Sequence, residues 1–86
     1  MDIMTHIRNN LYKESYKGFC LEDEDGYCMI ARRINKWQWS VETETAKGNI
    51  NTYDRVDYAQ VEEWASEMID NSENCAYNPY MWSDNA

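Results

Sequence analysis

The chain has 86 residues, the size of a single domain with a small core. Its 16 Asp and Glu residues against 8 Lys and Arg residues give a formal net charge of −8, which disfavours direct binding to nucleic acid or anionic lipid and favours a basic protein surface as the partner. Because no apolar run is long enough for a signal peptide or a membrane span, we expect a cytoplasmic protein that contacts no membrane.

Residues 2–15 predict a short N-terminal helix. Ile3, Ile7 and Leu11 recur at a spacing of four and therefore share one helix face, and Thr5 is the expected N-cap. A helix of this length needs an apolar surface to pack on, because it is barely stable alone.

Residues 16–45 predict a three-stranded antiparallel meander. The expected strands are residues 18–21, 27–34 and 37–44, joined by turns at residues 22–26 and 35–36. In the third strand, WQWSVETE, the apolar residues alternate with polar ones. Trp37, Trp39 and Val41 are therefore expected on one face, as the floor for a helix.

The clearest period in the sequence lies at residues 58–71, after a predicted loop at residues 46–54. Apolar residues recur there at the three-and-four spacing of an amphipathic helix, and Asp57 is the expected N-cap. The apolar stripe is Val61, Trp64, Ala65, Met68 and Ile69. The predicted fold is one α+β domain over residues 1–86, with this C-terminal helix packed on the meander and an irregular tail at residues 72–86.

The acidic run at residues 21–32 superficially resembles a calcium-binding loop. The first and last ligands of such a loop would be Leu21 and Arg32, and neither side chain can bind calcium. The run is better interpreted as an exposed hairpin turn.

The three cysteines are an odd number and lack the short spacings of zinc-binding modules. We expect Cys20, Cys28 and Cys75 to be reduced and to act as small apolar side chains. The sequence has one histidine and contains no phosphate-binding loop and no nucleophile elbow, so we expect a non-enzymatic protein without metal or cofactor.

Negative charge is concentrated in the last third of the chain. From residue 56 onward there is no Lys or Arg, while Asp and Glu contribute −7. Glu63, Glu67 and Asp70 lie opposite the apolar stripe of the predicted helix, in a row along its solvent face. The predicted partner-binding residues are Glu62, Glu63, Glu67, Asp70 and Glu73, extended by Asp23, Glu24 and Asp25 if the hairpin lies alongside.

Such a row of acids suggests DNA-mimic-like occlusion of a groove built for phosphates. The small size, the acidity, the aromatic content and the strand-then-helix layout WQWSVETE followed by VEEWASEMID resemble the small acidic proteins that phages encode against bacterial defence, including anti-CRISPR and anti-restriction proteins. The resemblance implies a non-enzymatic inhibitor, in the cytoplasm of a bacterial host, that binds a nucleic-acid-handling complex and blocks its DNA or guide channel. No residue role is carried over from it.

The alternative function is a small acidic interaction module that binds through its aromatic C-terminal tail. In that hypothesis Tyr77, Tyr80, Met81 and Trp82 are anchors in a partner's pocket, because large aromatic side chains dominate the energetics of many interfaces. Neither hypothesis implies an oligomeric state.

Overall fold

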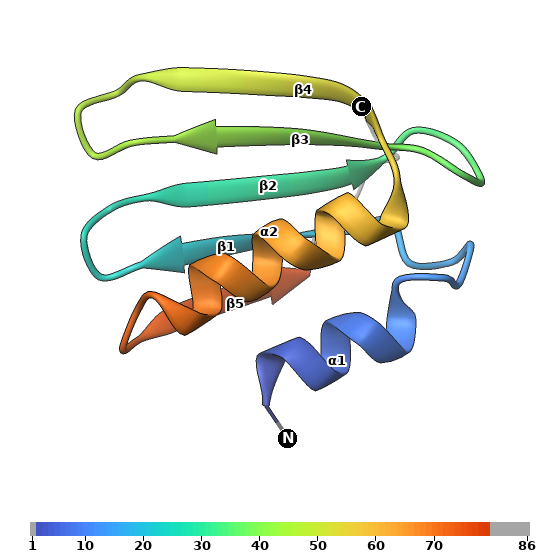
Figure 1. Cartoon of the computed structure of the whole chain (residues 1–86), viewed down its shortest axis with the longest axis horizontal. Helices are drawn as coiled ribbons and strands as arrows, with labels where there is room; N and C mark the ends of the chain where they lie inside the picture. The colour runs from blue at the N-terminus through green and yellow to red at the C-terminus, as the bar shows by residue number, and fades with distance from the viewer. Residues whose placement is uncertain (1, 80–86) are drawn as a thin grey trace, which may run out of the picture.

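The computed structural model describes residues 2–79. In this part of the chain five strands form one antiparallel sheet in the order β4-β3-β2-β1-β5 (Figure 1). The strands are β1 (Gly18–Asp23), β2 (Cys28–Arg33), β3 (Trp39–Glu44), β4 (Ile50–Val56) and β5 (Cys75–Pro79). The helices are α1 (Ile3–Asn10) and α2 (Tyr58–Asp70).

The prediction of a three-stranded meander is wrong, because two further strands extend the sheet at its edges. β4 occupies most of the expected loop at residues 46–54, and β5 lies inside the expected irregular tail. Every residue of β4 except Val56 is exposed, so the strand lacks the apolar alternation by which half-buried strands are recognised. Backbone pairing with β3 makes it a strand, and pairing with β1 does the same for β5.

The third strand begins at Trp39, two residues later than expected. The side-chain oxygen Oδ1 of Asn35 accepts hydrogen bonds from the backbone N–H groups of Trp37 (2.9 Å) and Gln38 (3.0 Å). These bonds lengthen the turn, since Asn side chains readily stabilise turns in this way. Trp37 consequently lies in the turn with 64% of its surface exposed, whereas Trp39 is fully buried.

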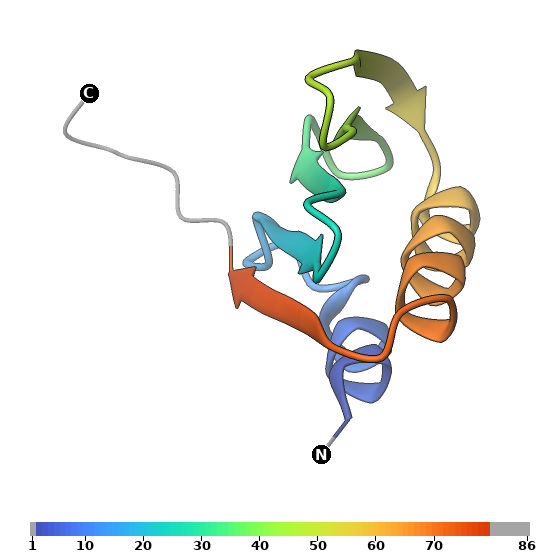
Figure 2. The same cartoon turned by 90° about the vertical axis from the view of Figure 1, so that its left-hand side faces the viewer.

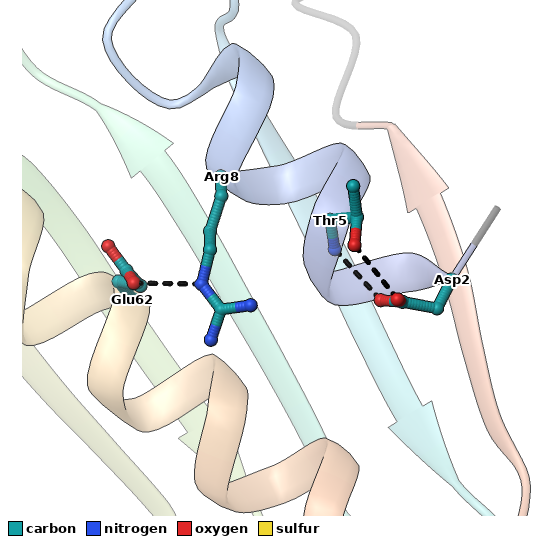
Figure 3. Close-up of polar contacts among 4 residues, drawn as sticks. All are labelled: Asp2, Thr5, Arg8 and Glu62. Carbon is teal, nitrogen blue, oxygen red and sulfur yellow. Dashed lines mark hydrogen bonds and ion pairs between the residues drawn. The ribbon is translucent and has the colours of Figure 1, made fainter.

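The first helix is shorter than expected, and its N-cap lies earlier in the chain than expected. Asp2, not Thr5, is its N-cap: the Asp2 carboxylate accepts hydrogen bonds from the backbone N–H and the hydroxyl group of Thr5, both at 2.8 Å (Figure 3). Met4 and Ile7 of α1 are buried against the rest of the protein, and so is Leu11, the C-cap residue of the helix. The predicted face is therefore confirmed for Ile7 and Leu11, whereas Ile3 is only half-buried and Met4 is buried beside it.

Both helices lie on the same side of the sheet, as Figure 2 shows. α2 buries Val61, Ala65 and Met68 and has Asp57 as its N-cap. These side chains meet the buried face of the sheet in one core, to which the strands contribute Phe19, Leu21, Met29, Ala31, Trp39 and Val41. No described helix or strand covers the opposite face of the sheet. Neither of the helices within residues 2–79 is long and apolar enough to cross a membrane.

A buried arginine, Arg33 at the end of β2, holds the connection between α1 and β1. Its guanidinium donates hydrogen bonds to the backbone carbonyl oxygens of Tyr16 (3.0 Å), Lys36 (3.1 Å), Leu11 and Lys13 (both 2.8 Å) and to the hydroxyl group of Tyr58 (3.1 Å). It also lies 4.9 Å from the ring centre of Trp39. Carbonyl oxygens and an aromatic face thus satisfy this buried cation.

Candidate acidic interface

The turn between β1 and β2 lies beside the C-terminal end of α2. The backbone N–H of Asn74, in the loop after α2, donates a 3.0 Å hydrogen bond to Oε2 of Glu24 in the turn. Residues that are 50 positions apart in the chain are thereby joined. The structure therefore brings the predicted acids of the hairpin next to those of the helix.

Six of the predicted partner-binding residues are exposed on the turn, on the outer face of α2 and in the loop after it, and we call them the acidic surface. They are Glu24, Asp25, Glu63, Glu67, Asp70 and Glu73. The two chain segments that form it, residues 18–31 and 56–79, contain no Lys or Arg. An open groove of about 650 Å³ runs between them, and the carboxylates of Asp2, Glu24 and Glu73 are among its lining.

The other two predicted residues, Asp23 and Glu62, are half-buried and are engaged within the fold. Oδ1 of Asp23 accepts hydrogen bonds from the backbone N–H groups of Asp25 and Tyr27, both at 2.9 Å, and so shapes the turn. Glu62 forms an ion pair with Arg8, with 2.9 Å between Oε2 and Nε (Figure 3). Glu62 therefore links α2 to α1 and offers less negative charge to a partner than Glu63 does.

The uncovered face of the sheet carries a second group of acids, and the sequence did not predict this face as a binding surface. Glu22, Glu42, Glu44 and Asp54 lie there, because their strand positions alternate with the buried ones. Arg32 is 3.8 Å from Glu42 on this face, so its charge is mixed. The alternation in WQWSVETE was the available signal for Glu42 and Glu44.

The cysteines are divided between the two faces of the sheet. Cys20 and Cys28 lie on the uncovered face, and Cys75 pairs with Asp23 on the helix side. Burial raises the pKa of all three thiols, and at Cys28 the neighbouring Glu22 and Glu44 raise it further. Raised pKa values keep the thiols protonated and weakly nucleophilic. Within residues 2–79, no three His, Cys, Asp or Glu side chains are grouped so that they could hold a metal ion.

A pocket of about 350 Å³ opens between α2 and the sheet, and we call it the aromatic pocket. Three rings line it, those of Tyr27, Tyr53 and Trp64, and the carboxylates of Asp23 and Glu67 belong to the same lining. The pocket was missed because its wall includes β4, for which the sequence predicts a loop.

The tail hypothesis has one residue within the described part of the chain. Tyr77 lies in β5, half-buried, with its hydroxyl oxygen 2.6 Å from that of Tyr16 and its ring stacked on Phe19. Tyr77 is therefore part of the fold. Tyr80, Met81 and Trp82 lie outside the described residues.

The acidic surface can attract a basic surface electrostatically. The aromatic pocket lies at the border of the acidic surface. Comparison with protein-family models, with curated proteins and with solved structures gives no match.

Proposed function

We propose that this protein is a non-enzymatic inhibitor that binds a basic, nucleic-acid-handling site of a bacterial defence complex through its acidic surface. The observation that supports this most is the hydrogen bond between Glu24 and Asn74, because it holds the acids of the hairpin beside the C-terminal end of α2. The acidic surface is negative over both contributing segments, and such an arrangement costs stability by self-repulsion. Use in binding explains why that cost is tolerated.

The inhibitor would act by occupying the place of nucleic-acid phosphates. Glu63, Glu67 and Asp70 are exposed and follow one another along α2 at intervals of one helical turn. Neighbours at such spacings are about 5–6 Å apart, whereas duplex DNA carries one charge per about 1.7 Å of its axis. The protein thus offers a sparser row of anions than DNA, which a groove rich in Arg and Lys would still attract. Occupation of that groove excludes DNA or guide RNA without any chemical step.

The decisive variant reverses three charges together: Glu63→Lys, Glu67→Lys and Asp70→Lys. These side chains are exposed and lie away from the buried stripe of α2, so the fold should persist. We expect the wild-type protein to block target-DNA binding by at least one member of a panel of purified, guide-loaded CRISPR effector complexes and restriction enzymes, measured by fluorescence anisotropy. The variant should lose this inhibition, and added salt should weaken the wild-type effect.

A matched control reverses three exposed acids elsewhere, with Glu14→Lys, Glu44→Lys and Asp54→Lys. Its net charge equals that of the first variant, so it should still inhibit if position matters. Equal loss in both variants would show that only net charge acts. Absence of inhibition by the wild-type protein across the panel, or survival of inhibition in the first variant at physiological salt, would refute the proposal.

A further inference from the structure

We infer that the aromatic pocket receives an arginine side chain of the partner protein. The inference rests on the proposed function and gives it a specific anchor, because it names the partner group that enters the protein. The pocket lies at the border of the acidic surface, with Glu67 belonging to both.

The walls of the pocket suit a flat cation. The ring centres of Tyr53 and Trp64 are 4.9 Å apart with their planes at 50°, so the two rings form a corner, which Tyr27 extends. Aromatic faces attract cations electrostatically, and the attraction grows when the cation is removed from water. The nearly buried side chains of Met29 and Met68 form an apolar floor, against which the aliphatic part of a long side chain could lie.

The charges of the pocket exclude an anion and favour a cation. Asp23 and Glu67 are its two ionisable carboxylates, and none of its lining residues is Lys or Arg. Within residues 2–79 the Glu67 carboxylate makes no hydrogen bond or ion pair, and the two bonds to Asp23 both use Oδ1. Both carboxylate oxygens of Glu67 and Oδ2 of Asp23 therefore remain to accept hydrogen bonds from a ligand.

Arginine fits this combination better than lysine. The guanidinium group is planar, stacks on aromatic rings, donates two parallel hydrogen bonds to a carboxylate and is less strongly hydrated than an ammonium group. The volume, about 350 Å³, is at the small end of the usual range for ligand pockets, about 300–1,000 Å³, as expected for one side chain. A site that handles nucleic acid supplies such arginines, since they are its phosphate ligands.

The test titrates the full-length protein with blocked tripeptides and needs no partner. Acetyl-Gly-Arg-Gly-amide should shift the NMR signals of the Trp64 indole N–H and of the Tyr27 and Tyr53 amides. The matched peptide with citrulline, which has the shape of arginine without its charge, should bind at least about tenfold more weakly, and the lysine peptide about threefold more weakly. Equal shifts with arginine and citrulline, or equal affinity for lysine, would overturn the assignment.

Two protein variants locate the site. Glu67→Gln should weaken binding of the arginine peptide about three- to tenfold, because it removes a charge from the pocket. Glu63→Gln removes the same charge one turn away, outside the pocket lining, and should change the affinity less than twofold. Equal effects of the two variants would show diffuse attraction and overturn the inference. Such a failure would leave the proposed function standing, since that function is tested by inhibition of a nucleic-acid-handling complex and not by the binding of a peptide.

Discussion

Nη2 of Arg33 donates a 2.8 Å hydrogen bond to the carbonyl oxygen of Leu11, so that the last residue of β2 holds the C-terminal end of α1. The cation lies where the helix presents unpaired carbonyl groups and the negative end of its dipole. One side chain thus fixes the position of the first helix against the sheet.

Replacement of Arg33 by Met should lower the free energy of unfolding by about 2–4 kcal/mol, because several buried carbonyl oxygens lose their donor. Arg32→Met is the matched control: Arg32 is the adjacent residue, points to the uncovered face and is half-exposed, so its replacement should have a smaller effect. Urea denaturation followed by circular dichroism measures both values. Similar losses in the two variants would contradict the role assigned to Arg33.

Gly18 should be irreplaceable for a steric reason. A Cβ atom there would lie 2.2 Å from the carbonyl oxygen of Ala31, on the neighbouring strand. Gly48 also has a positive φ, but a Cβ atom there would meet nothing within 4 Å. Gly48→Ala should therefore cost about 1–2 kcal/mol from backbone strain alone, and Gly18→Ala should cost clearly more or prevent folding. Equal melting temperatures of the two variants would disprove the clash.

Asp2 should make α1 sensitive to acid. Thr5 donates two hydrogen bonds to the Asp2 carboxylate, and both lower the pKa of Asp2. The bond from the backbone N–H has the larger effect, and the bond from the hydroxyl group has the smaller one. The stabilisation is thus fully present above the ordinary value of 3.8 and is lost as the pH falls through the lowered pKa. Asp2→Asn should keep the cap and reduce the loss of stability between pH 4 and pH 2, as measured by thermal melting. An unchanged pH profile would refute this.

Tyr16 should make the protein sensitive to alkali. Burial is the larger cause that raises the pKa of Tyr16 above the ordinary value of 10.0, and the hydrogen bond with Tyr77 raises it further. The folded state therefore holds this proton more tightly, so the stabilisation is present below pH 10 and falls as the pH rises above it. Tyr16→Phe should remove this decline in urea unfolding above pH 10. The decline that begins lower, from the cysteines with raised pKa values, should persist in the variant.

The parts of the fold that were predictable are those in which side chains carry the structural signal. The period at residues 58–71 predicts α2, which spans Tyr58–Asp70, because one face of that helix is buried. β4 could not be predicted in this way, since backbone pairing at an exposed edge leaves no apolar alternation in INTYDRV. Arg32 and Arg33 are neighbours of the same residue type, so the sequence does not distinguish them. Because they point to opposite faces of β2, Arg32 forms an ion pair on the surface and Arg33 is buried and binds backbone carbonyl oxygens.

The candidate site was predictable in composition and not in arrangement. The absence of cations in the last third of the chain indicates the acids of α2, but their proximity to Glu24 depends on how the hairpin lies against the loop containing Asn74. The aromatic pocket depends on Tyr53 reaching Trp64 from a strand that the sequence does not reveal. Contacts between distant segments follow from the sheet order, which no local pattern specifies.

Charge is also graded along the strands. The β1–β2 turn, which lies beside the end of α2 in Figure 1, is negative. At the opposite ends of β1 and β2, the backbones of Lys13, Lys17 and Lys36 contact Arg33. Within the described residues, charge is therefore separated along β1 and β2. An approaching cationic partner would be drawn to the end that carries Glu24 and Asp70, which raises the fraction of productive collisions. Variants that move charge from one end to the other at constant net charge should therefore change the association rate more than the dissociation rate.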